Sequence, residues 1–332
     1  MENLEETRRT LTDTSAHDVQ MLPRSARMRI VDRVITRLLG LPAATTDYSV
    51  RRGIPIPMRD GVVLRADHYA PHTSTPAGTL LVRCPYGRDA PLAWLYPRVY
   101  AQRGYHVVFQ SARGTFGSGG NYEPGMHEIE DGADTVAWLR REAWFTGTFG
   151  TFGQSYLGFT QWALLVDPPP ELAAAVITVG PHDLTAALLH NGGLAINNVL
   201  WWCDQAAHQE EGGRLSRILR QRTSERPVRA AADGLPLGRS GRALLGMGAP
   251  WYESWLQHTD VGDEYWAPCQ LDDALDRTNI PVLLIGGWQN LFLGPNARAV
   301  HATAGQRCTT GAAYRPVDAH RNVGQGGRSR WA

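Results

Sequence analysis

The sequence of 332 residues contains no lysine, and all 33 of its basic residues are arginines. Arginine has CGN codons whereas lysine has only AAA and AAG, so this bias indicates a GC-rich gene. With 32 acidic residues, the formal net charge is +1. A balanced charge gives no electrostatic reason to expect nucleic acid or an anionic membrane as a partner.

Cysteines and long apolar runs are also scarce. The cysteines are far apart and include no C-x-x-C pair, so neither a zinc site nor a disulfide framework is expected; they are Cys84, Cys203, Cys269 and Cys308. No apolar stretch reaches the roughly 18 residues that a membrane helix needs, and the first residues do not resemble a secretory signal. We therefore expect a cytoplasmic protein without a metal or a cofactor.

The composition indicates a folded chain. Hydrophobic residues make up 43% of the sequence and charged residues 20%, which excludes disorder of the chain as a whole. The length fits one large α/β domain with an insertion, or two modest domains.

Residues 1–47 are predicted to form an N-terminal arm. Apolar residues recur in it at helical spacing, with arginines between them; they are Ile30, Val31, Val34, Ile35, Leu38 and Leu39. A basic amphipathic helix can lie on a membrane. We favour the simpler interpretation, in which the arm packs on its own domain.

Strands and helices alternate over residues 48–184. Asp60-Gly61 separates two strand-like runs and predicts a hairpin. Buried strands are expected at 79–83, 105–109 and 173–179, and helices at about 91–103 and 131–142. This alternation predicts a mostly parallel sheet covered on both faces.

Two later segments break this rhythm. Residues 185–275 are helix-like with no obvious strand and are predicted to form a helical cap, after which 276–302 return to the sheet with a strand near 281–287. Residues 303–332 contain no Leu, Ile, Met or Phe, and only Val317 and Val323 among the larger aliphatic residues. We do not expect this tail to supply a buried strand.

The sharpest local signal is Gly153-Gln154-Ser155-Tyr156-Leu157-Gly158, between a short strand and a helix. This is the context of a nucleophile elbow, in which a tight strained turn exposes a serine hydroxyl. The usual pattern is G-x-S-x-G, and here the second glycine comes one residue later. The spacing fits equally well a Ser155 that caps the helix after a glycine turn.

Further blocks give the sequence a specific resemblance to the CocE/NonD family of serine hydrolases, which contains cocaine esterase and X-Pro dipeptidyl-peptidases. These blocks follow the order of the family over roughly residues 48–300; they are Ile56-Pro57-Met58-Arg59-Asp60-Gly61-Val62, Arg83-Cys84-Pro85-Tyr86-Gly87, Arg113-Gly114, Trp144-Phe145-Thr146-Gly147, the elbow with Gln161-Trp162, and Gly286-Gly287-Trp288. The resemblance implies an α/β-hydrolase core, a helical cap and a C-terminal jelly-roll domain, the last of which we expect to be absent here.

The resemblance also implies roles for single residues. Ser155 matches the nucleophile, the backbone N–H of Tyr156 one oxyanion donor, and the Tyr86 hydroxyl the second donor. Trp201, Trp202 and Trp288 are candidates for lining the substrate pocket, although the first two fit a cap core equally well.

The other two positions of the expected triad depart from the family. Asn290 stands where the family has aspartate after the strand near 281–287, and an amide cannot stabilise an imidazolium as a carboxylate does. The family motif Gly-Pro-Trp-x-His is missing, and His320 remains as the candidate base.

A frameshift would account for the missing motif. Residues 314–320 can be encoded by codons that, read one base later, give Gly-Pro-Trp-Thr-His. The tail 303–332 is therefore a possible frameshift product, with the shift between about 296 and 313. The nucleotide sequence over 313–320 tests this hypothesis. Codons that do not give Gly-Pro-Trp-Thr-His in the shifted frame would refute it.

We expect a serine hydrolase that cleaves an ester or amide of a small molecule or peptide through an acyl-enzyme on Ser155. The choice among X-Pro peptides, acyl esters and β-lactam-like antibiotic esters stays open, as does a homo-oligomeric state. The alternative is a catalytically dead, truncated remnant that only binds ligands or partners. A third hypothesis is that the chain is a related hydrolase in which another histidine serves as the base.

Overall fold

The structure, a computed structural model, describes residues 21–23, 25–88, 91–190, 193–304 and 311–314. Within these residues, nine strands form one sheet in the order β1-β2-β3-β5-β4-β6-β7-β10-β11. The strands of this sheet are β1 (Met21–Pro23), β2 (Tyr48–Pro57), β3 (Val63–Pro71), β4 (Gly78–Cys84), β5 (Tyr105–Ser111), β6 (Phe149–Gln154), β7 (Leu172–Thr178), β10 (Val282–Gly286) and β11 (Gly311–Tyr314).

The first three strands are antiparallel. β2 and β3 form the predicted hairpin, closed where the Met58 N–H donates to the Val62 carbonyl oxygen at 2.8 Å. Gly61 in this turn has φ 85°, a backbone conformation that glycine adopts without strain. From β5 to β11 all neighbouring strands are parallel, as the alternation of strands and helices predicted.

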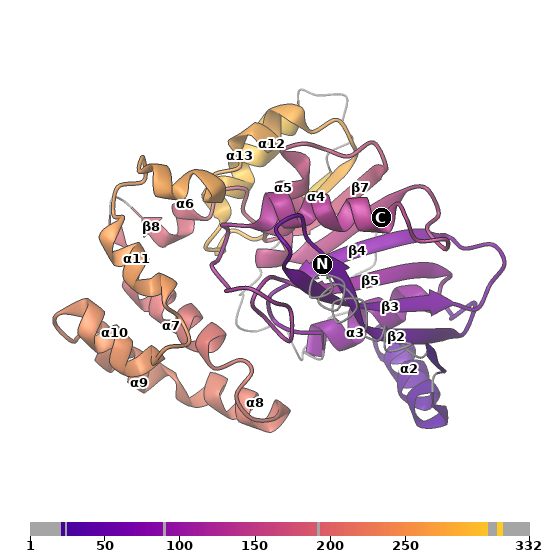
Figure 1. Cartoon of the computed structure of the whole chain (residues 1–332), viewed down its shortest axis with the longest axis horizontal. Coiled ribbons are helices and arrows are strands. Elements are labelled where there is room, and N and C mark those ends of the chain that lie inside the picture. The colour runs from indigo at the N-terminus through magenta and orange to yellow at the C-terminus, as the bar shows by residue number, and fades with distance from the viewer. Residues whose placement is uncertain (1–20, 24, 89–90, 191–192, 305–310, 315–332) are drawn as a thin grey trace, which may run out of the picture.

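Helices cover both faces of the sheet (Figure 1). α3 (Pro91–Ala101) packs on one face, where its tyrosines contact Val82, Phe109 and Phe152. The other face carries α4 (Glu128–Leu139), α5 (Tyr156–Leu165), α12 (Asp272–Arg277) and α13 (Leu293–Ala304). Every residue of α5 is buried, so the helix that follows Ser155 lies inside the hydrophobic core.

A separate group of helices stands beside the sheet (Figure 1). It comprises α6 (Thr185–Leu188), α7 (Ile196–Ala207), α8 (Arg214–Thr223), α9 (Glu225–Ala232), α10 (Leu237–Leu245), α11 (Trp251–Gln257) and the 3₁₀ helix η1 (Glu264–Cys269). These helices share their own core around Trp251, Trp255 and Trp266. The prediction that 185–275 contain no strand was wrong in one detail, because β8 (Leu189–His190) and β9 (Gly193–Leu194) form a short antiparallel pair.

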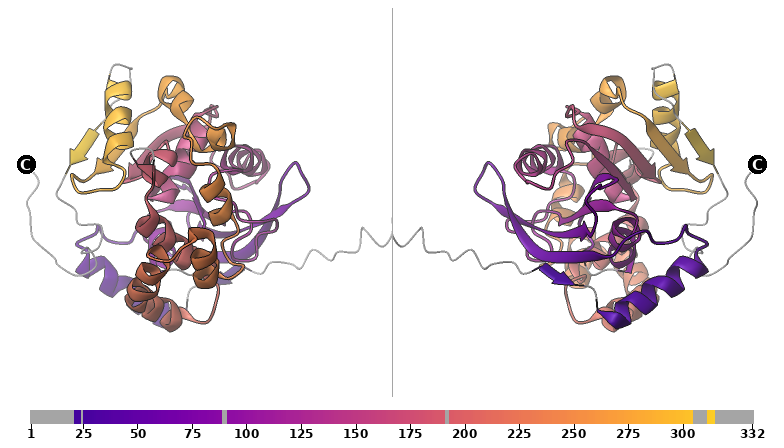
Figure 2. Two further views of the ribbon diagram at one scale, coloured as in Figure 1. Left: turned by 90° about the vertical axis from the view of Figure 1, so that its left-hand side faces the viewer. Right: turned by 90° about the vertical axis from the view of Figure 1, so that its right-hand side faces the viewer.

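The helix predicted in the N-terminal arm is α2 (Ala26–Leu38), at the edge of the molecule (Figure 2). It is held by an ion pair between buried Asp32 and Arg98 of α3, at 2.8 Å. Its residues Ile30, Val34 and Leu38 are 59%, 49% and 79% exposed. The face of α2 that carries Asp32 therefore packs on the domain, as expected. The apolar row of Ile30, Val34 and Leu38 does not. None of the helices that the structure describes combines the length and hydrophobicity that a membrane crossing requires.

The described part of the tail forms one short strand at the end of the strand order, whereas our expectation concerned a buried strand. β11 pairs in parallel with β10, with Leu283 opposite Gly311 and Gly286 opposite Tyr314. Pairing at the edge of a sheet depends on backbone hydrogen bonds, so the small residues Gly311, Ala312 and Ala313 suffice where large aliphatic residues are missing.

Candidate active site

Ser155 occupies a strained turn between β6 and α5. Its backbone has φ 56° and ψ −126°, and its side chain caps no backbone N–H of the helix. A non-glycine residue at positive φ is uncommon and is found mainly where the surrounding structure enforces it. Here the Ser155 N–H donates to the carbonyl oxygen of Thr178 at 3.0 Å. The geometry is that of a nucleophile elbow, and the capping alternative does not apply.

Glycines at three positions allow this turn. A Cβ on Gly153 would lie 2.5 Å from the Cβ of Leu157. Gly158 and Gly180 face each other, and a Cβ on either would lie 2.5 Å from the Cα of the other. The second glycine of the motif comes one residue later than usual because position 158, rather than 157, meets the segment after β7.

Tyr86 follows β4 and brings its hydroxyl to the elbow. Burial raises the pKa of this phenol above its usual range, while hydrogen bonds with the Trp202 indole, the Ser155 hydroxyl and the Tyr156 backbone N–H lower it by less. The phenol is therefore protonated at neutral pH and able to donate. The Tyr86 hydroxyl therefore lies close enough to the Ser155 side chain and to the Tyr156 backbone N–H for both to influence its pKa.

Aromatic rings from the cap lie over this group. The Trp202 indole N–H points to the Tyr86 hydroxyl oxygen at 3.5 Å, and its ring stacks on Tyr156 with a centroid distance of 6.4 Å. On its other side Trp202 stacks on Trp255 of the cap core. The structure therefore brings Trp202 to the candidate site. Trp201 and Trp288 are 37% and 63% exposed, and their place in a substrate pocket stays a prediction.

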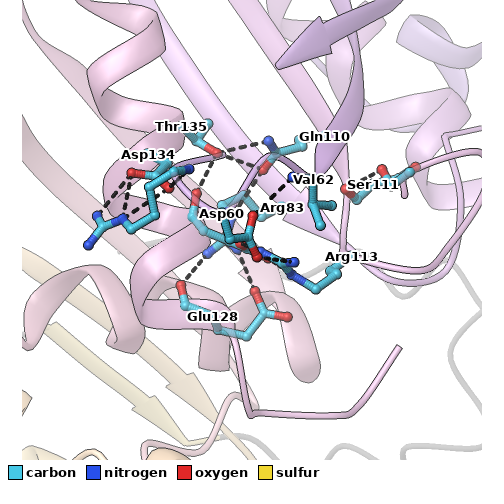
Figure 3. A network of polar contacts seen from close by, with 12 residues as sticks. Asp60, Val62, Arg83, Gln110, Ser111, Arg113, Glu128, Asp134 and Thr135 are labelled. Carbon is cyan, nitrogen blue, oxygen red and sulfur yellow. Dashed lines mark hydrogen bonds and ion pairs between the residues drawn. The ribbon is translucent and has the colours of Figure 1, made fainter. Parts of the chain in front are cut away.

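A polar network that the sequence did not predict joins β4, β5 and α4 (Figure 3). Its centre is the buried Glu128 of α4, which pairs with Arg83 at 2.6 Å and accepts a hydrogen bond from the Tyr156 hydroxyl at 2.8 Å. Glu128 is separated in sequence from both partners, so no local pattern could have revealed this contact.

Comparison with known proteins now identifies the family. Residues 60–318 match the family described as X-Pro dipeptidyl-peptidase (S15 family). The chain belongs to this family. It is 32% identical over 290 residues to the cocaine esterase of Rhodococcus sp. (strain MB1 Bresler), an alignment that covers 80% of this chain and 49% of that protein. The chain thus spans about half the length of this curated relative.

Solved structures agree on the fold. An α-amino acid ester hydrolase matches with a TM-score of 0.60 at 23% identity, covering 80% of this chain and 47% of that one. A CocE/NonD family hydrolase from Staphylococcus aureus matches with a TM-score of 0.58 at 20% identity, covering 77% and 44%. The predicted α/β-hydrolase core and the resemblance to CocE/NonD hydrolases are confirmed.

In this S15-family chain, the predicted acid position lies after β10. The Asn290 side-chain oxygen accepts a hydrogen bond from the Phe292 N–H at 2.7 Å, so the amide closes a local turn. Both Ser155 and Asn290 follow parallel strands, and parallel strands end at the same edge of a sheet. His320, the candidate base, lies outside the described residues.

The buried and half-buried histidines that the structure describes contact residues other than Ser155. His68 contacts His106 at 2.9 Å, and His182 faces Asp272 at 3.1 Å. His208 bonds to the Asp204 carbonyl oxygen and His258 to the Asp263 carboxylate. Among the residues that the structure describes, none of these five has a contact with Ser155.

Proposed function

We propose that this chain is a serine hydrolase that cleaves an ester or amide through an acyl-enzyme on Ser155. The observation that carries the proposal is the backbone of Ser155, at φ 56° directly between β6 and α5. The influence of the Ser155 side chain and the Tyr156 N–H on the pKa of Tyr86 supports it. Membership of the S15 family supports the same reaction class.

In the proposed reaction, the Ser155 oxygen attacks the substrate carbonyl carbon while a base accepts the hydroxyl proton. The carbonyl oxygen becomes an oxyanion, and the Tyr86 hydroxyl and the Tyr156 N–H donate hydrogen bonds to it. The carbon–oxygen or carbon–nitrogen bond then breaks, and the leaving group takes the proton. Water attacks the acyl-enzyme in the same way and restores Ser155.

The proposal also assigns a base and a residue that orients it. We assign the base to His320, which comes six residues after the end of β11 at Tyr314. Asn290 follows the neighbouring strand and would orient the imidazole. An amide supplies no charge to the imidazolium, so we expect slow turnover.

The substrate is proposed to be an acyl ester or an amide, including an X-Pro peptide, that places an apolar group against Trp202. The ring of Trp202 reaches the Tyr86 hydroxyl from the cap and is half-buried, so it can cover the acyl group. Two of the similar proteins are named as ester hydrolases, which makes esters the first substrates to test.

The test is labelling of the purified chain with a fluorophosphonate, with Ser155→Ala as the control. We expect covalent labelling of the wild type alone, and slow hydrolysis of p-nitrophenyl butyrate that is lost in the same variant. Hydrolysis unaffected by Ser155→Ala would refute the site. A folded chain that is not labelled would support the alternative of a remnant that only binds ligands or partners.

A further inference from the structure

A buried ion pair contacts the side chain of Tyr156, the residue that follows Ser155. Arg83 at the end of β4 and Glu128 at the start of α4 meet at 2.6 Å, with side chains 1% and 6% exposed. The guanidinium also donates to the Glu128 carbonyl oxygen at 2.7 Å and to the Gln110 side-chain oxygen at 3.1 Å. Gln110 in turn bonds to Thr135 (Figure 3). The cation is thereby fixed from several sides.

The second oxygen of the Glu128 carboxylate serves Tyr156. The Tyr156 hydroxyl donates to it at 2.8 Å and accepts from the Gly125 N–H at 2.8 Å. Tyr156 is the residue after Ser155, and its own backbone N–H is near enough to Tyr86 to lower the pKa of that phenol. The hydroxyl of Tyr156 is therefore held by Glu128, while the backbone of the same residue lies near Tyr86.

We propose that Glu128 is a positioning residue for the oxyanion hole: it holds the Tyr156 phenol, and through that residue it fixes the backbone N–H beside Ser155. This inference rests on the proposed function, because it concerns the same site. Glu128 touches no substrate in this scheme and acts only through Tyr156.

The chemistry of the carboxylate fits this task. Burial and the Glu128 charge hold the pKa of Tyr156 well above its usual range, so the phenol keeps the proton that it donates. The guanidinium of Arg83 compensates the carboxylate charge. Without that compensation, a buried negative charge so close to the elbow would oppose the oxyanion.

A purely structural role is the competing explanation, and α4 offers a matched control. One turn later on this helix, Asp131 binds Arg113 through both carboxylate oxygens, at 2.5 and 3.1 Å. Asp131 is 1% exposed. The Asp131→Asn change therefore disturbs a comparable buried ion pair on the same helix without touching Tyr156.

The perturbing variants are Glu128→Gln, Tyr156→Phe and their combination. Arg83 and Tyr156 donate to different carboxylate oxygens of Glu128. An amide at position 128 keeps an acceptor at only one of these two positions and places an NH₂ donor at the other. Phenylalanine removes the hydroxyl and keeps the ring. The readouts are the fluorophosphonate labelling rate and the separate kcat and KM for p-nitrophenyl butyrate, with circular dichroism to show that each variant is folded.

We expect each single variant to lower the labelling rate and kcat about fivefold or more, with KM within about twofold of wild type. The double variant should be no slower than the slower single one, because both changes break one connection. Asp131→Asn should label within about twofold of wild type. Additive losses, or an equal loss in Asp131→Asn, would overturn the inference while leaving the proposed function standing.

A second measurement separates this failure from failure of the proposed function. If the wild type is not labelled at all, the proposed function fails, and 3-fluorotyrosine incorporated in place of Tyr156 decides whether Glu128 holds the phenol. Its ¹⁹F resonance should shift in Glu128→Gln and stay unchanged in Asp131→Asn. An unmoved resonance in Glu128→Gln would refute the positioning role.

Discussion

The contact between Gly158 and Gly180 gives the sharpest test of how the elbow is built. Alanine at position 158 would place a Cβ 2.5 Å from the Cα of Gly180 and 3.0 Å from the Cγ2 of Ile177. Neither atom is the end of a flexible side chain. Because α5 is buried along its whole length, the clash can be relieved only if the helix or the segment after β7 moves.

Two opposing contributions set how much Gly158→Ala changes the free energy of unfolding. Replacing glycine by alanine inside a helix favours folding by about 1 kcal/mol, whereas overpacking a tight core disfavours it by about 1–3 kcal/mol, and by more when backbone must move. With a contact as short as 2.5 Å, we place the overpacking at or above the top of that range. The net effect of Gly158→Ala should be a loss of about 2 kcal/mol in the free energy of unfolding.

The labelling rate should fall as well. A shift of α5 displaces the Tyr156 N–H relative to Ser155, and misplacement of about 1 Å can lower a rate by about 10²-fold. We therefore expect fluorophosphonate labelling of Gly158→Ala to be at least about tenfold slower than that of wild type.

Gly150→Ala is the matched control, because Gly150 lies in β6 of the same unit. Its added Cβ would come no closer than 3.4 Å to Leu80 and 3.5 Å to the Ala174 carbonyl oxygen. Urea unfolding followed by tryptophan fluorescence, together with the labelling assay, would compare the two variants. Equal stabilities and equal labelling rates for Gly158→Ala and Gly150→Ala would show that the glycine contact does not shape the elbow.

Three further predictions concern single side chains. Tyr86→Phe removes one proposed oxyanion donor and should lower kcat by about 10²-fold with little change in KM; an unchanged kcat would mean that the phenol does not contact the oxyanion. Asn290→Asp should raise kcat by up to about 10⁴-fold if a histidine serves as the base, and no gain would place the acid elsewhere or point to the remnant. Burial lowers the pKa of His68 to about 3, so the folded chain binds fewer protons than the unfolded chain between that value and the ordinary value near 6.5. The resulting stability is present above pH 6.5 and is lost as the pH falls, by about 1.4 kcal/mol per unit at most; urea unfolding at pH 7 and pH 5 should show a smaller loss in His68→Gln than in wild type.

The elbow could be predicted because it is local. Ser155, its flanking strand and its helix occupy one continuous stretch. The spacing fitted a helix cap equally well, and the resemblance of the surrounding blocks decided between the two interpretations. The hairpin at Asp60-Gly61 was predictable because it too is local. In both cases the residues that form the turn are adjacent in the sequence, so their types indicate the backbone angles directly.

Contacts across the fold could not be predicted in this way. The meeting of Tyr86 with Ser155 followed from family resemblance rather than from spacing, and the contact of Glu128 with Tyr156 from neither. The strand β11 was not predicted because aliphatic residues were used as the sign of a buried strand, whereas an edge strand needs only backbone partners. The exposed row on α2 was missed because periodicity shows that a helix has an apolar side but not what covers it.

The proposed site has a first half, the elbow with its oxyanion donors, and a second half, the acid and the base. Different parts of the chain supply the two halves. Residues from 83 to 158 supply the elbow, both proposed oxyanion donors and the Glu128 network, and their hydrogen bonds are complete without any residue after β10. The proposed acid and base instead follow β10 and β11, where Asn290 replaces the expected aspartate. Because an oxyanion hole and substrate binding alone retain part of the catalysis of a complete triad, a weakened second half predicts slow acylation of Ser155 rather than none. The labelling rate of the wild type, and its change in Asn290→Asp, therefore measure the second half independently of the first.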